Sequence, residues 1–209
     1  MTQALHDIIM DVCLALSDEG REEALALIER RCPFDPMARP ALPNCPCAPL
    51  ERRPEAVSCW SEDHTVKMRV FARDGFIDRF TGEPLVFPAV LRLLSREFPR
   101  AFPFQEFWGL SEIHLAYYQV GACTARSLPK SRGGDAREPN LLTTTMPYVL
   151  ARSDLTPEEA GWRVTREGFV DEWDGMSTWY VEYVNGHQEL RKANFFNLWY
   201  NAAKQVLHL

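Results

Sequence analysis

The 209-residue sequence predicts an α+β fold in which helices surround a small hairpin region. Apolar residues recur at helical spacing near both ends of the chain. In the middle, the turn signals Asp74-Gly75 and Thr81-Gly82 flank a short stretch that is expected to belong to the hairpin region. Apolar residues make up 46% of the sequence and charged residues 25%, so a sizeable core is possible without disulfides.

The N-terminal segment, residues 1–31, is expected to be helical. Its apolar residues follow helical spacing as far as Gly20, which breaks the pattern. These residues are Leu5, Ile8, Ile9, Val12, Cys13 and Leu16. A second short helix is predicted over residues 22–31. The segment lacks a basic start followed by an uninterrupted apolar run, so it is not expected to be a secretory signal.

The next segment, residues 32–64, is expected to be a linker or an irregular wrapped segment, because its seven prolines exclude continuous helix and central strand. It contains four cysteines, namely Cys32, Cys45, Cys47 and Cys59. Four thiolates could hold one structural zinc ion here, although the spacing is not that of a standard zinc knuckle. The alternative is four reduced cysteines, some of them buried as small apolar residues.

Residues 65–165 form the expected main body. Residues 67–71 alternate between polar and apolar side chains, which predicts a strand, and residues 87–98 have the pattern of an amphipathic helix. A further helix is predicted to begin at Thr156, because Glu159 stands at the capping-box position and Pro157 fits the first helical turn.

The C-terminal segment, residues 166–209, is predicted to form helices that pack on the main body. One apolar face consists of Met176, Trp179, Tyr180, Tyr183 and Val184, and another consists of Phe196, Trp199, Tyr200, Ala203 and Leu207. Trp and Tyr side chains at this spacing are expected to be part of the core rather than a platform for a ligand.

The net charge of −6 argues against a protein that coats nucleic acid with its whole surface, so any such contact must be local. No stretch approaches the roughly 18 consecutive apolar residues that span a bilayer, and we expect no membrane partner. A cytoplasmic location, in which the cysteines stay reduced, is the expectation that follows.

Three stretches together resemble a bacterial branch of the HNH endonuclease family. The first is residues 73–82, which read Arg-Asp-Gly-Phe-Ile-Asp-Arg-Phe-Thr-Gly. The second is residues 121–134, ending in Gly133-Gly134 and followed by Asn140, and the third is residues 156–162, continuing to residues 172–175. The resemblance covers the chain from about residue 67 onwards and implies a ββα-metal core within residues 65–165, with helical additions at both ends.

In that family, the resemblance implies, a strand carries an Asp-His pair, a Gly-Gly loop and an Asn follow, and a helix supplies a last His or Asn ligand. The Asp-His pair falls here on Ala125-Arg126, the Asn on Asn140 and the last ligand on Val149. Alanine and valine have no ligand atom, and arginine stays protonated and cannot act as a general base. We therefore interpret the chain as a non-cleaving relative. The structural zinc knuckle of many relatives is also lost, since Asp78 and Thr81 stand at its positions.

The loop after Ala125 is locally basic, with Arg126, Lys130, Arg132 and Arg137 as candidate nucleic-acid-binding residues. They could grip phosphates, or they could belong to an ordinary solvated loop. An arginine in place of a metal site could convert phosphate cleavage into phosphate binding, because its planar fork matches a phosphate group.

Two other functions remain open. The chain could be an active endonuclease, dependent on a divalent metal, whose site is rebuilt from residues such as His114, Asp135 or Asp154. His114 has a second interpretation as a hydrogen-bonded core histidine. Alternatively, the chain could be a protein-interaction module that does not bind nucleic acid. The partner is thus a nucleic acid or a protein, and the oligomeric state is not predicted.

Overall fold

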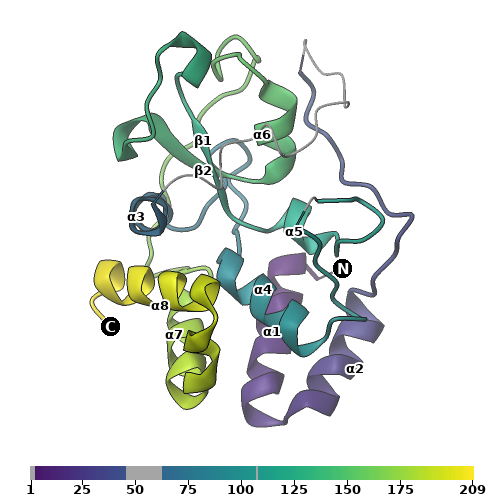
Figure 1. Cartoon of the computed structure of the whole chain (residues 1–209). Coiled ribbons are helices and arrows are strands. Elements are labelled where there is room, and N and C mark those ends of the chain that lie inside the picture. Colours follow the sequence, from purple (N-terminus) through teal and green to yellow (C-terminus); the bar gives the residue numbers. More distant parts are fainter. Residues whose placement is uncertain (1–2, 46–62, 107) are drawn as a thin grey trace.

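The structure, a computed structural model, describes residues 3–45, 63–106 and 108–209. Its elements are α1 (Leu5–Asp18), α2 (Arg21–Arg31), α3 (His64–Arg73), α4 (Pro88–Glu97), α5 (Ala116–Gln119), β1 (Cys123–Arg126), η3 (Lys130–Arg132), η4 (Glu138–Asn140), β2 (Leu141–Thr144), α6 (Met146–Arg152), α7 (Ser177–Gly186), η5 (Gln188–Lys192) and α8 (Asn194–Leu207). In Figure 1, β1, β2 and α6 lie at one end, α1, α2, α4, α7 and α8 lie at the other, and α3 lies between. This helix-rich arrangement confirms the predicted α+β class.

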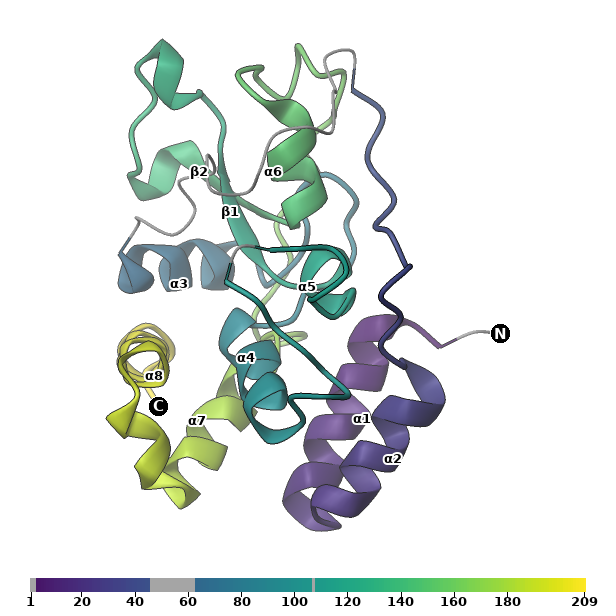
Figure 2. The same ribbon diagram turned by 45° about the vertical axis from the view of Figure 1, so that its right-hand side comes forward.

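The two N-terminal helices are confirmed and lie side by side (Figure 2). Gly20 separates them and has a φ of 95°, a value that favours glycine, so α2 can begin at the next residue. Ile9 and Ile28 are fully buried where the helices face the core. After α2, residues 32–45 contain no helix or strand and run extended along one side of the molecule (Figure 1).

One apolar core joins the helices of the larger end. The ring of Phe87 meets Trp199 of α8 at 5.1 Å and Tyr180 of α7 at 5.4 Å, in both cases edge to face. Phe71 of α3 stacks on Trp199 at 6.1 Å. Helices α4, α7 and α8 were predicted, and the aromatic residues of α7 and α8 lie in the core or pack against it. No helix in the described part of the chain is long and apolar enough to cross a membrane.

The strand predicted over residues 67–71 is wrong, because these residues belong to α3. Asp63 caps this helix, with its side chain accepting a hydrogen bond from Thr65 N at 2.7 Å. The buried positions are Lys67, Met68, Val70 and Phe71. That spacing is helical, and a five-residue window is too short to separate it from a strand pattern by periodicity alone.

The sheet lies later in the chain than the turn signals indicated. Strands β1 and β2 pair antiparallel, with Ala125 opposite Leu142 and Arg126 opposite Leu141. The stretch between the two turn signals contributes only an isolated bridge between Ile77 and Pro84.

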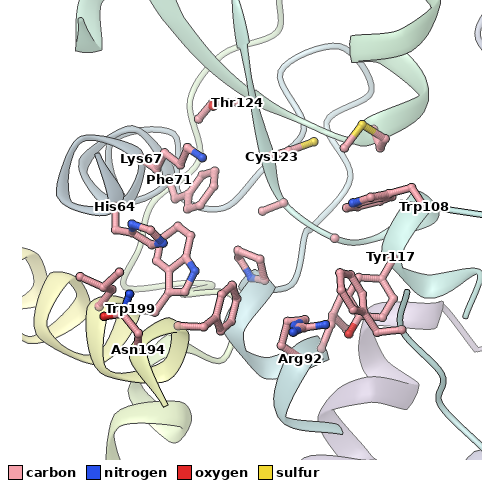
Figure 3. A pocket seen from close by; sticks show the side chains of 18 residues that line it. His64, Lys67, Phe71, Arg92, Trp108, Tyr117, Cys123, Thr124, Asn194 and Trp199 are labelled. Atoms are coloured by element: carbon pink, nitrogen blue, oxygen red, sulfur yellow. The ribbon is translucent and has the colours of Figure 1, made fainter. Parts of the chain in front are cut away.

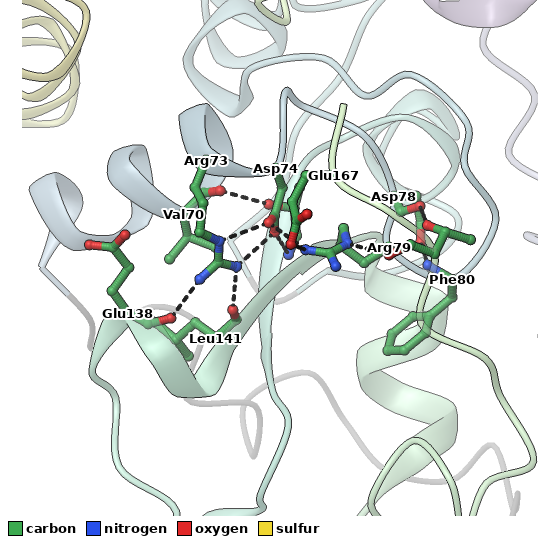
Figure 4. Close-up of polar contacts among 11 residues, drawn as sticks. Val70, Arg73, Asp74, Asp78, Arg79, Phe80, Glu138, Leu141 and Glu167 are labelled. Carbon is green, nitrogen blue, oxygen red and sulfur yellow. Dashed lines mark hydrogen bonds and ion pairs between the residues drawn. The ribbon is translucent and has the colours of Figure 1, made fainter. Parts of the chain in front are cut away.

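The turn after α3 is fastened to β2 by the buried carboxylate of Asp74 (Figure 4). Asp74 accepts hydrogen bonds from Arg73 Nε at 2.9 Å, Arg79 Nη1 at 2.7 Å and the backbone N of Thr143 at 2.8 Å. Arg73 also donates to the carbonyl oxygens of Glu138 and Leu141. This network holds the start of β2 in place and gives Arg73, Asp74 and Arg79 of the 73–82 stretch a structural role.

The helix predicted to begin at Thr156 does not form, although its capping bonds do. Glu159 N donates to Thr156 Oγ1 at 3.3 Å, and Thr156 N donates to Glu159 Oε2 at 2.9 Å. Gly161 then adopts a φ of 77°, and Trp162 N bonds back to Pro157 O. The left-handed glycine ends the turn before a second helical turn can follow.

Candidate functional site

The residues singled out in the sequence lie along one continuous unit of strand, loop, strand and helix. Ala125 and Arg126 end β1, and Asn140 directly precedes β2. Val149 lies in the middle of α6, which follows β2. The chain order is therefore the one that the sequence analysis assumed for these positions.

Asn140 holds together the loop that joins the two strands. Its Oδ1 accepts a hydrogen bond from Leu128 N at 2.8 Å, and its Nδ2 donates to Leu128 O at 3.0 Å and to Asp135 O at 2.8 Å. Gly134 passes so close to the same region that an added Cβ would lie 1.7 Å from Leu128 O. The Gly-Gly sequence and Asn140 together set the path of the loop.

The side chains at the three positions that the resemblance assigns to the Asp-His pair and the last ligand offer no metal-binding atom. Ala125 is buried, and Val149 is half-buried and packs against the core. Arg126 is half-buried, and its Nε donates to Asp135 O at 3.1 Å. Within the described residues, no three His, Cys, Asp or Glu side chains are grouped so that they could hold a metal ion.

Arg152, which sequence reasoning missed, is the most unusual residue of this unit. It ends α6, three residues after Val149 and so on nearly the same side of the helix. The residue is only 5% exposed, yet its Nε and Nη1 have no hydrogen-bond partner among the described residues. Burial, and then the nearby positive charge of Arg126, lower the pKa of Arg152 to about 10. The carboxylate of Glu158 acts in the opposite direction and raises the pKa of Arg152.

The other basic residues of the loop are on the surface. Arg132 forms a two-pronged ion pair with Glu159, with both N–O distances 2.8 Å, and Arg137 pairs with Asp135. Lys130 is exposed and has no ion pair within the described part of the chain. Of the four predicted phosphate contacts, Arg126 is the one whose charge acts on the buried guanidinium of Arg152.

The residues proposed for a rebuilt site are not brought together as a cluster. His114 is 3% exposed, its ring stacks on Phe102 at 3.9 Å, and its Nε2 bonds to Cys32 O at 2.8 Å. Its Nδ1 accepts from Ala116 N, so both ring nitrogens are engaged, and burial lowers the pKa of His114 to about 4. Asp135 bonds Arg137, whereas Asp154 accepts a hydrogen bond from Ser131 at 3.2 Å.

Two of the four cysteines in the zinc prediction, Cys47 and Cys59, lie outside the described residues. Cys32 is buried at the end of α2, and burial raises the pKa of its thiol to about 11. Cys45 follows Asn44, whose carbonyl oxygen accepts a hydrogen bond from Trp162 Nε1 at 2.8 Å. The zinc site stays a prediction.

Comparison with known proteins does not identify the chain, since no family model, curated protein or solved structure matches it.

Proposed function

We propose that the chain is a non-cleaving HNH-endonuclease-like protein that binds the phosphate backbone of a nucleic acid through Arg126 and Arg152. The observation that carries the proposal is the buried guanidinium of Arg152, in which two donor nitrogens have no hydrogen-bond partner among the described residues. The positive charge of Arg126 acts on the same group. Buried donors without a partner are costly, and an anion that accepts hydrogen bonds from Arg152 would remove that cost. A phosphodiester fits, because a guanidinium binds two phosphate oxygens at once.

The order of strand, Asn140-held loop, strand and helix supports the assignment to an HNH-like unit. The residues that would perform cleavage are replaced, since Ala125 and Val149 offer no metal ligand and Arg126 offers no base. In the proposed site, the cationic side chains of Arg126 and Arg152 would contact the phosphate without a metal ion. In the proposed role, the protein binds a phosphate group through positive charge but does not hydrolyse the phosphodiester.

The contact with nucleic acid is expected to be small. Arg132 and Arg137 are neutralised by neighbouring carboxylates, and the net charge of the chain is −6. If two phosphates are bound, the logarithm of the binding constant should fall against the logarithm of salt concentration with a slope of about −1.4 to −1.8. Affinity should therefore be highest at low ionic strength.

The test is fluorescence anisotropy with labelled single-stranded DNA, duplex DNA and RNA at low salt, in the presence of a chelator. Arg126→Ala and Arg152→Met should each weaken binding by about tenfold or more, the loss expected for a charge-assisted hydrogen bond of about 1.5–3 kcal/mol. Arg100→Ala, at an exposed arginine after α4, is the matched control and should change nothing. Unchanged affinity of both site variants would refute the proposal. Absence of any binding by the folded protein would favour a protein-interaction module instead.

A second assay asks whether cleavage survives. Plasmid, single-stranded DNA and RNA are incubated with Mg²⁺, Mn²⁺, Ni²⁺ or chelator, beside an Asn140→Ala, His114→Ala double variant. We expect no cutting with any metal. Metal-dependent cutting that the double variant abolishes would replace the proposal with an active, rebuilt endonuclease.

A further inference from the structure

A cavity of about 290 Å³ lies at the opposite end of β1 from Arg126 (Figure 3). Its walls come from α3, α4, α8, the start of β1 and the segment before α5. Most of the lining is apolar, and the aromatic members are Phe71, Phe104, Trp108, Tyr117, Phe195 and Trp199. The volume is near the lower end of the range for small-molecule sites, about 300–1,000 Å³. A cavity of this volume suits a ligand with a single ring or with two fused rings.

The charged groups of the cavity are all of one sign. Lys67 and Arg92 line it, and no Asp or Glu does so among the described residues. Lys67 is only 7% exposed, and burial, followed by the charge of Lys67, lowers the pKa of His64, so this third polar group is neutral at pH 7. The cavity therefore presents the cationic side chain of Arg92 in surroundings that are mainly apolar.

Arg92 is placed to receive an anion. Its guanidinium carbon lies 3.6 Å from the ring centroid of Phe104 and 5.2 Å from that of Phe195, and burial lowers its pKa. The guanidinium makes no hydrogen bond or ion pair within the described residues, and the nearest carboxylate that acts on it belongs to exposed Glu106, outside the lining. Figure 3 shows Arg92 and Tyr117 on one side of the cavity, and Lys67, His64 and Trp199 on the other.

We infer that this cavity binds a small aromatic carboxylate. The ring system packs among the aromatic walls, where edge-to-face and stacked contacts are favourable, and the carboxylate takes a two-pronged hydrogen bond from Arg92. The site is separate from the proposed phosphate contact and does not depend on it.

The experiment uses naphthalene-2-carboxylate and its uncharged analogue 2-naphthamide, titrated into the full chain by calorimetry and by tryptophan fluorescence. Trp108 and Trp199 line the cavity, so the fluorescence should report occupancy directly. We expect the carboxylate to bind at least about tenfold more tightly than the amide, which corresponds to one charge-assisted contact.

Three variants separate the charge from the apolar walls. Arg92→Met should abolish the preference for the carboxylate while amide binding persists, and Arg92→Lys should keep part of the preference, since it retains the charge but loses the fork. Arg100→Met is the control at an exposed arginine and should bind both compounds as the parent does. Denaturation curves establish that each variant is folded. No binding of either compound, or equal binding that Arg92→Met leaves unchanged, would overturn the inference.

Discussion

Replacing Arg152 by methionine tests whether this arginine is retained for a ligand rather than for the fold. Two of its N–H groups are buried without a partner, and Arg126 repels it. Methionine keeps an unbranched apolar stem of similar reach but carries neither charge nor donors. Replacement of buried, poorly satisfied charge by an apolar residue of similar volume is often neutral or stabilising.

The magnitude follows from the two donors. Each unsatisfied buried donor costs about 1–3 kcal/mol, so their removal should raise the free energy of unfolding by about 2 kcal/mol or more. Relief of the repulsion from Arg126 acts in the same direction. The same variant should bind nucleic acid more weakly, so stability and binding are expected to change in opposite senses.

The assay is urea denaturation followed by tryptophan fluorescence, for the parent, Arg152→Met and Arg132→Met. Arg132 is the matched control, because it is an exposed arginine of the same loop unit, paired with Glu159, and its loss should not stabilise the fold. A double-mutant cycle with Arg126→Ala should give an unfavourable interaction free energy between the two arginines. A clear loss of stability in Arg152→Met would refute the reasoning, since it would mean that the guanidinium is bonded within the fold.

Two further predictions concern buried titratable groups. Asp74→Ala leaves the buried Arg79 without its main partner and should lower the free energy of unfolding by about 3–5 kcal/mol in denaturation experiments. The control Asp11→Ala, at a half-exposed pair with Arg31, should lower it by less than about 1 kcal/mol. Similar losses for both variants would contradict the structural role of Asp74. The pKa of His114 is lowered to about 4 from 6.5, so the unfolded chain takes up the proton first as pH falls. The contribution of neutral His114 to the free energy of unfolding should be at its maximum, up to about 3 kcal/mol, above pH 6.5. It should be lost as the pH falls from 6.5 to about 4. His114→Gln should show a correspondingly flatter pH dependence of the free energy of unfolding, and an unchanged curve would count against burial of the neutral ring.

The long amphipathic helices could be predicted because their periodicity extends over several turns. Helices α1, α7 and α8 repeat their apolar positions often enough to identify the helical period. The five residues 67–71 do not, and α3 was mistaken for a strand. At Thr156 the capping signal was correct as local chemistry, but Gly161 follows too soon for a helix to continue.

From the sequence, the chemistry of the candidate site could be predicted only at positions where the residue type alone limits what the side chain can do. Arg126 cannot be a base and Val149 cannot bind a metal in any fold, and Asn140 has the loop-holding contacts that its place in the motif suggested. The importance of Arg152 was not visible, because an arginine at the end of a short helix is usually solvated. Its burial arises from the packing of α6 within the strand-loop-strand unit.

By itself, the sequence determined the helix-rich α+β composition of the chain, and it determined that the side chains at residues 125, 126 and 149 offer neither a general base nor a metal ligand. These are properties of local periodicity and of side-chain functional groups, which need no knowledge of neighbours. Only the tertiary structure decided that the guanidinium of Arg152 is buried without partners for two of its nitrogens, and that residues from His64 to Trp199 line one aromatic cavity with Arg92. Burial and charge coupling depend on distances between segments far apart in the chain, and those distances are set by packing.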